Sequence, residues 1–227
     1  MHPPARDTRR RWTGLVAAGL AAPALLLLGP GSALAAPREY TLDPAASLLR
    51  VIVQRQGALS VLAHDHVFAA KGLAGRISFN TDAPAATAAE ISIPVAALEV
   101  DDSKEREREG FTGELNESNR ASVRTNMLAP DQLAAAAFPR ITVAVERTEG
   151  SLPSLRLRLR VRIRQQEQTL TAPVTAILNG DTLTVRGETE LLQSAFGITP
   201  YASLLGAIAV QDAVRVKFEI VARASRS

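Results

Sequence analysis

The sequence predicts a mainly β protein in which about eight antiparallel strands form a barrel or a sandwich. From Tyr40 onward, apolar and polar residues alternate, whereas a 3.6-residue repeat is weak. Turn-forming segments separate the alternating runs, and Asn179-Gly180-Asp181 lies between two of them as expected for a hairpin. Cysteine is absent, so the fold has no disulfide and must be stabilised by packing.

Residues 1–35 have the organisation of a secretory signal peptide. Four arginines precede an Ala/Leu-rich apolar run at residues 15–28, and Ala33-Leu34-Ala35 supplies the small residues that a signal peptidase recognises. We expect cleavage before Ala36, near Ala35, which leaves residues 36–227 as a single domain. The sequence therefore predicts a periplasmic or secreted protein.

The excess of positive charge lies in this leader. The chain has 26 Lys and Arg and 23 Asp and Glu, and residues 1–35 contain four of the bases and one of the acids. The remainder is neutral, so we expect no nucleic-acid partner. The triplet Arg9-Arg10-Arg11, followed by Trp12, resembles a twin-arginine export signal, although an ordinary basic start fits equally well.

Eight segments have the alternation of strands. They are residues 49–55, 75–79, 89–95, 140–146, 155–164, 169–177, 182–189 and 213–221. In the most regular one, residues 155–164, five aliphatic residues alternate with five arginines. We expect the aliphatic face inside and the arginines in solvent, where acids such as Glu188 and Glu190 on neighbouring strands could pair with them. A membrane-spanning barrel is disfavoured because only 4% of residues are aromatic.

Residues 101–138 interrupt the strand pattern and predict a helical insertion. The dense charge run from Asp101 to Glu109 lacks the spacing of a calcium loop and is expected to be a solvated surface. The alanine-rich segment 131–138 is expected to form a helix with Asp131 as its N-cap, and Pro139 stops it.

Five segments, taken in order along the chain, resemble the YceI-like family of bacterial periplasmic polyisoprenoid-binding proteins. They are Tyr40-Thr41-Leu42-Asp43-Pro44, Gly75-Arg76-Ile77-Ser78-Phe79, Phe138-Pro139-Arg140-Ile141-Thr142-Val143, Ala195-Phe196-Gly197-Ile198-Thr199-Pro200 and Gln211-Asp212-Ala213-Val214-Arg215-Val216. The resemblance implies an antiparallel lipocalin-like β-barrel whose apolar cavity holds an isoprenoid chain, with the helical insertion against the barrel.

The chain departs from the family pattern in two places. Gln54-Arg55-Gln56-Gly57 stands where many members have a histidine after the first long strand, and Ala195 stands where an aspartate usually precedes Phe-Gly. The fold implied by the resemblance is unaffected, but the headgroup contact or the ligand itself can differ from that of other members.

Medium-sized aliphatic side chains on the inward faces of the strands are the candidate ligand contacts. They are Val51, Val53, Ile77, Ile91, Ile93, Leu155, Leu157, Leu159, Val161 and Ile163. Phe196, in the closing motif, is expected beside the mouth or wall of the cavity. An eight-strand barrel is just wide enough for side chains or one slim ligand, so a solid core is the alternative to a cavity.

His64 and His66 are the two histidines that follow the leader, and they flank Asp65. On a strand, residues two apart face the same way, so the histidines would form a pair. Such a pair could contact a diphosphate or quinone headgroup, or ligate haem or a metal. A solvated turn is the third interpretation. No metal site is assigned, because a structural zinc site needs four ligands.

These features predict extracytoplasmic binding, storage or transport of an isoprenoid-like lipid or quinone in the barrel, and no other cofactor. A haem- or metal-binding redox accessory protein using His64 and His66 is the alternative, and a structural envelope domain without ligand is a further one. No common catalytic motif is present, so we do not expect an enzyme. The expected partners are the apolar ligand and, transiently, the membrane or an envelope protein.

Overall fold

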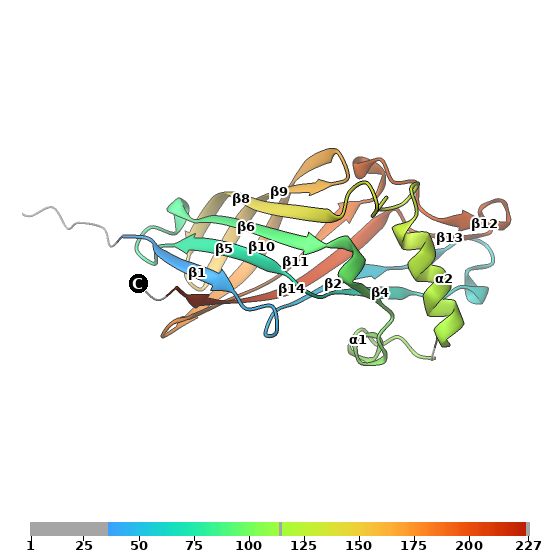
Figure 1. Ribbon diagram of the computed structural model, residues 1–227, viewed down its shortest axis with the longest axis horizontal. Helices are drawn as coiled ribbons and strands as arrows, with labels where there is room; N and C mark the ends of the chain where they lie inside the picture. The colour runs from blue at the N-terminus through green and yellow to red at the C-terminus, as the bar shows by residue number, and fades with distance from the viewer. Residues whose placement is uncertain (1–35, 114, 226–227) are drawn as a thin grey trace, which may run out of the picture. The chain divides into compact units, whose positions relative to one another are not determined.

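The computed structural model describes residues 36–113 and 115–225, and the predicted signal peptide lies outside these residues. Eight antiparallel strands form a closed barrel (Figure 1), because the first and last strands of the ring, β1 and β14, also pair with each other. In ring order the strands are β1 (Arg38–Leu42), β5 (Ala74–Phe79), β6 (Ala88–Pro94), β8 (Arg140–Ser151), β9 (Ser154–Ile163), β10 (Gln166–Asn179), β11 (Thr182–Leu192) and β14 (Ala213–Ala224). The predicted barrel is confirmed.

The long strand β14 is shared between two sets of neighbours. Its last residues, 222–224, pair with β1, and residues 215–219 pair with β2. The wall then continues through β2 (Leu48–Val53), β4 (His66–Ala70) and β7 (Leu98–Val100). A separate small sheet, in the order β12 (Ala202–Ser203), β13 (Ile208–Val210) and β3 (Arg55–Gln56), lies near the same end of the barrel as the start of β4 (Figure 1).

Strand β9 shows why the sequence pattern produces a barrel. Its side chains alternate strictly between exposed and buried, with every aliphatic residue from Leu155 to Ile163 inside and Arg156, Arg158, Arg160 and Arg162 outside. Strands β10 and β11 continue the meander through a two-residue turn, in which Gly180 adopts a φ of 58°. The predicted hairpin at this position is confirmed.

The insertion contains two α-helices, α1 (Ser103–Arg108) and α2 (Glu117–Leu128). Asn116 caps α2 by accepting a hydrogen bond from the amide of Asn119 at 2.8 Å. Arg124 of α2 donates to the carbonyl oxygens of Leu98 and Ala96, which fixes the helix against β7. In the described part of the chain, no helix has the length and apolar character needed to span a membrane.

The helix predicted for residues 131–138 is wrong. These residues form consecutive turns, and Ala134 adopts a left-handed φ of 48° that ends any helical run. The amide of Ala134 donates to the carbonyl of Ala129, while Leu133 and Ala135 pack against the barrel core. Tertiary packing thus outweighs the helix propensity of the alanines.

Candidate ligand-binding site

The barrel encloses a cavity of about 330 Å³. All ten aliphatic side chains that the sequence analysis selected line it. They are Val51, Val53, Ile77, Ile91, Ile93, Leu155, Leu157, Leu159, Val161 and Ile163. The remaining wall is also mainly aliphatic, with Phe68, Phe79 and Phe218 as its phenylalanines. The sequence is compatible with either a cavity or a solid core, and the structure has a cavity.

One end of the cavity differs from the rest because hydrogen-bonding side chains gather there. They are His66, Asn126, Gln132, Thr189, Gln193 and Tyr201. These residues belong to the start of β4, the last turn of α2, the end of β11 and the segments that follow α2 and β11. Figure 1 shows that these elements lie at the same end of the barrel as the small sheet β12-β13-β3. The site thus has an apolar shaft and a polar end.

His66 is the ionisable side chain of this polar end. Its ring lines the cavity and stacks on Phe68, with the ring centroids 6.3 Å apart. Nδ1 lies 2.6 Å from a carboxylate oxygen of Asp101. Because a carboxylate can only accept, Nδ1 donates in this bond, and Nε2 is the ring nitrogen that Asp101 leaves available. The Asp101 contact therefore fixes the orientation of the His66 ring.

Asp101 is buried directly behind His66. Its second carboxylate oxygen accepts hydrogen bonds from the amide of Val67 and from the guanidinium of Arg106, both at 2.9 Å. Burial alone would raise the pKa of Asp101, but the hydrogen bonds from His66, Val67 and Arg106 outweigh burial and hold the pKa below its ordinary value. Asp101 is thus a carboxylate near neutral pH, and its charge is balanced by Arg106.

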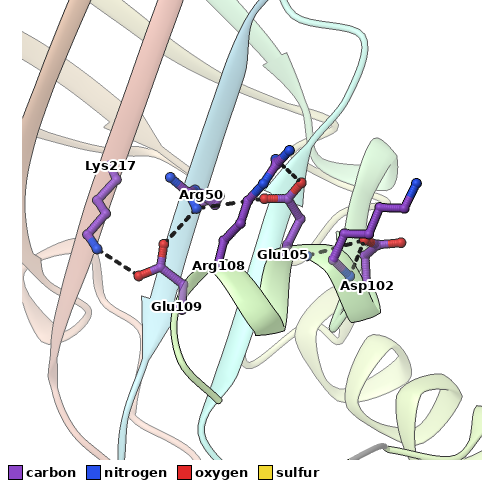
Figure 2. A network of polar contacts seen from close by, with 7 residues as sticks. Arg50, Asp102, Glu105, Arg108, Glu109 and Lys217 are labelled. Atoms are coloured by element: carbon purple, nitrogen blue, oxygen red, sulfur yellow. Dashed lines mark hydrogen bonds and ion pairs between the residues drawn. The ribbon is translucent and has the colours of Figure 1, made fainter. Parts of the chain in front are cut away.

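A second group of buried charges fixes α1 to the outer surface of the barrel (Figure 2). Glu109, which follows α1, lies 2.8 Å from Arg50 of β2 and 2.7 Å from Lys217 of β14. Its side chain is only 3% exposed. Within the helix, Glu105 accepts from Arg108 at 2.7 Å. These ion pairs fasten the segment that carries Asp101 and Arg106, so they support the position of His66 from outside the barrel.

The expectation that the charge run 101–109 is a solvated surface holds for Lys104, Glu107 and Arg108 but is wrong for three other residues of the run. Asp101, Glu105 and Arg106 are all less than 10% exposed. The sequence could not reveal this, because the partners of the run are distant in sequence. His66 lies 35 positions from Asp101, and Lys217 lies 108 positions from Glu109.

His64 and Phe196 lie outside the cavity wall formed by the described residues. His64 precedes β4 and is exposed, so the argument that two histidines share a strand face applies to His66 alone. Asp65, between them, accepts a hydrogen bond from the amide of Arg55. Phe196 is buried beside β10 and β11, and its neighbour Ile198 lines the cavity. Contact of His64 or Phe196 with a ligand stays a prediction.

The part of the chain that the structure describes contains no cluster of three or more His, Cys, Asp or Glu side chains able to hold a metal ion.

Five polar residues of the site were not predicted from the sequence. They are Asn126, Gln132, Thr189, Gln193 and Tyr201. Nothing in their local sequence marks them, since they come from separate elements that meet only in the folded barrel.

The protein is therefore an antiparallel β-barrel with an apolar cavity that has one polar end. A family model for the YceI-like domain matches residues 40–222, and the chain belongs to this family. No curated protein matches the chain.

Two solved structures have the same fold. The crystal structure of BcnA from Burkholderia cenocepacia is similar with a TM-score of 0.58 and 20% identity, over 79% of this chain and 98% of BcnA. The YceI protein of Campylobacter jejuni gives a TM-score of 0.51 and 11% identity, over 70% of this chain and 84% of that protein. At these identities the similarity establishes the fold alone.

Proposed function

We propose that the protein binds, stores or transports an isoprenoid-like lipid or quinone in its barrel cavity, outside the cytoplasm. The observation that carries the proposal is the apolar cavity, whose described lining has no Asp, Glu, Lys or Arg side chain. Its volume of about 330 Å³ lies in the range of small-molecule sites. Residues 1–35, which resemble a signal peptide, support the extracytoplasmic location.

The physical basis of binding is burial of the ligand's chain. Each methylene-sized unit transferred from water into the cavity contributes about 0.8 kcal/mol, so a chain of several such units needs no charged contact in the shaft. Membership of the YceI-like family adds to this argument, because the resemblance implies a polyisoprenoid chain as the occupant.

The haem or metal alternative has less support. His64 is exposed outside the cavity wall, so the two rings do not face the cavity together as a shared metal site would require. The bond between Nδ1 of His66 and Asp101 leaves Nε2 of that one histidine open to haem or a metal. Binding of a lipid uses the whole cavity, whereas the alternative leaves it without a role.

Organic extraction of the purified protein, followed by mass spectrometry of the extract, tests the proposal. We expect a lipid with one long apolar chain in stoichiometric amount. An extract without such a lipid, from protein that also fails to take up an added isoprenoid, would overturn the proposal. An absorption band or a stoichiometric metal in the same sample would support the alternative.

A substitution on β9 links the lipid to the cavity. Leu159→Trp places a larger side chain in the cavity, so we expect severalfold less co-purified lipid and a loss of unfolding free energy below about 2 kcal/mol, since a cavity can accept volume that a packed core cannot. Arg158→Trp is the matched control, because Arg158 points outward from the next position on the same strand. Equal lipid content in both variants would contradict binding in the cavity.

A further inference from the structure

The polar end of the cavity contains hydrogen-bonding groups but lacks the groups that bind highly charged anions. Proteins bind a diphosphate with Arg or Lys side chains or with the free amides of a glycine-rich loop or helix terminus. Among the described residues that line the cavity, there is no Arg or Lys. At this end, the polar lining consists of imidazole, amide and hydroxyl groups, contributed by His66, Asn126, Gln132, Thr189, Gln193 and Tyr201.

The charges nearest to this end are already matched. The carboxylate of Asp101 is held by His66, by the amide of Val67 and by Arg106. Arg106 in turn also donates to the carbonyl oxygen of Asp65 at 2.7 Å. A diphosphate beside His66 would therefore lie close to the carboxylate of Asp101, and no described Arg or Lys of the cavity lining would offset the repulsion between the two anions.

We propose that this end of the cavity recognises a small uncharged headgroup, a hydroxyl or a carbonyl, and discriminates against a diphosphate on the same chain. The inference rests on the proposed function and names the headgroup class of the same site. Nε2 of His66, the ring nitrogen that Asp101 does not engage, can form a hydrogen bond with the oxygen of an alcohol, a quinol or a quinone. The hydroxyl of Thr189 already donates to the carbonyl of Thr171, and Gln132 and Gln193 each donate one N–H to a backbone carbonyl. The amide of Asn126, the hydroxyl of Tyr201 and the second N–H of each glutamine can donate to a carbonyl oxygen, so a prenyl alcohol, a quinol and a quinone all fit.

Displacement of Nile red from the purified protein measures this selectivity. Farnesol, farnesyl diphosphate and farnesene share one chain and differ only in the headgroup. We expect farnesol to displace the dye at a concentration at least about tenfold lower than the diphosphate, as the difference between a satisfied and an unbalanced headgroup requires. We expect farnesene, which lacks a headgroup, to bind more weakly than farnesol.

Two variants test the role of His66. His66→Phe keeps an aromatic ring beside Phe68 but loses the ring nitrogen that can bond to the headgroup, so the preference for farnesol over farnesene should disappear while farnesene binding persists. His66→Gln, which retains a hydrogen-bonding group, should restore part of the preference. Equal or tighter binding of the diphosphate, or an unchanged farnesol preference in His66→Phe, would overturn the inference. If none of the three compounds binds, the proposed function itself fails and the inference fails with it.

A second, independent observation concerns the surface at this end of the barrel. Two neighbouring loops, residues 57–63 and 201–207, form what we call the apolar tip. Val61, Leu62, Leu204 and Leu205 are between 63% and 109% exposed there. The loops are joined by a hydrogen bond from the amide of Leu59 to the carbonyl of Ala207 at 2.8 Å and by the pairing of β13 with β3.

The chemistry of the apolar tip is that of a membrane-inserting loop. Neither segment contains a charged residue, so the tip offers no electrostatic complement to a charged protein or nucleic acid. Leu204 and Leu205 both have left-handed backbone, with φ of 48° and 55°, an unfavourable conformation that leaves Leu205 fully exposed. Tyr201 of the tip and Val210 of β13 also line the cavity, so the tip is continuous with the binding site.

We infer that the apolar tip inserts into the surface of a lipid bilayer, which places the polar end of the cavity against the membrane during exchange of the ligand. Because the tip is uncharged, binding should depend on apolar insertion and little on salt or anionic lipid.

Sedimentation of the protein with phosphatidylcholine vesicles tests this inference. The double variant Val61→Asp and Leu205→Asp should bind at least about tenfold more weakly than the wild type, since a carboxylate resists entry into the bilayer. Ile177→Asp is the matched control, because Ile177 is a half-exposed aliphatic residue beside the β10–β11 turn, which lies at the opposite end of these strands from the tip. The control and the double variant have the same N-terminal sequence, so any vesicle binding by residues 1–35 contributes equally to both.

Equal loss in the double variant and in Ile177→Asp would overturn the inference, as would binding that requires anionic lipid and disappears in salt. A wild-type protein that does not bind vesicles would also overturn the inference. If that protein forms dimers and the double variant does not, the tip is an interface between two copies of the chain.

Discussion

Two sets of ion pairs lie on the outer surface of the barrel, and they differ in burial far more than in geometry. On β9, Arg158 lies 3.3 Å from Glu146 and Arg162 lies 2.9 Å from Glu167, with both arginine side chains more than half exposed. Beneath α1, Glu109 lies 2.7 Å from Lys217 and its side chain is 3% exposed. Similar distances thus occur between exposed side chains on β9 and around a buried carboxylate beneath α1.

Solvent exposure, more than distance, determines how much an ion pair contributes to the free energy of unfolding. Exposed pairs typically contribute between zero and about 1 kcal/mol, because water and salt screen them. Removing one partner of a buried pair costs about 3–5 kcal/mol, because the other charge is left without compensation. We therefore assign a structural role to the pairs beneath α1, which fasten the segment behind His66, and little energetic role to the β9 pairs.

The largest effect is expected from breaking the buried set. Glu109→Gln removes the charge that Arg50 and Lys217 share, and we expect a loss of about 3 kcal/mol in the free energy of unfolding, at the low end of the buried range because both bases are partly exposed. Urea denaturation measures it. Glu146→Gln, which removes the carboxylate near Arg158 and Arg160, is the control and should cost less than about 1 kcal/mol. Equal losses in the two variants would contradict the comparison.

A smaller effect, specific in its pH dependence, is expected at Asp101. Its pKa is lower in the folded protein than the ordinary value, so the folded state favours the carboxylate. The stabilisation is complete above the unfolded pKa of about 3.9 and is lost as the pH falls through the lower folded pKa.

Asp101→Asn should consequently reduce stability near neutral pH and flatten its decline in acid. Unfolding free energies of both proteins, measured from pH 7 to acid, check this expectation. Parallel curves would show that Asp101 does not titrate as the structure implies. High salt should change this contribution little, because the group is buried.

The smallest effect is expected on the exposed face of β9. Arg162→Gln removes the pair with Glu167 and should change the unfolding free energy by less than about 1 kcal/mol. The remaining difference from the wild type should vanish in high salt, where exposed pairs are screened. A loss that persists in high salt would mean that the arginine row has a structural role.

The sequence predicts the barrel well because its long strands bury one face and expose the other. Strand β9, with strict alternation, was placed within a residue of its observed bounds, and the inward aliphatic residues follow directly from the period of two. The short strands β1, β4, β7, β12 and β13 are absent from the predicted set, since two to five residues provide too little alternation to detect. One of them, β1, closes the ring, whereas the predicted strand β2 lies outside it.

The ion-pair partners of charged residues could not be predicted from the alternation of apolar and polar residues. Glu188 and Glu190 were expected near the arginine row, but β9 lies between β8 and β10, which contribute Glu146 and Glu167 instead. Glu188 lies 3.5 Å from Arg215 of β14. Burial of Asp101 and Glu109 likewise depends on how α1 packs, which no local pattern in a charge run reveals.

A crystal structure of the protein loaded with a prenyl alcohol or a quinone would show whether the ligand lies in the barrel cavity. The account predicts one continuous chain inside the barrel, in contact with Leu157 and Leu159, and a headgroup within hydrogen-bond distance of the polar side chains around His66. A ligand bound only on the outer surface, with the cavity filled by rearranged side chains, would contradict it.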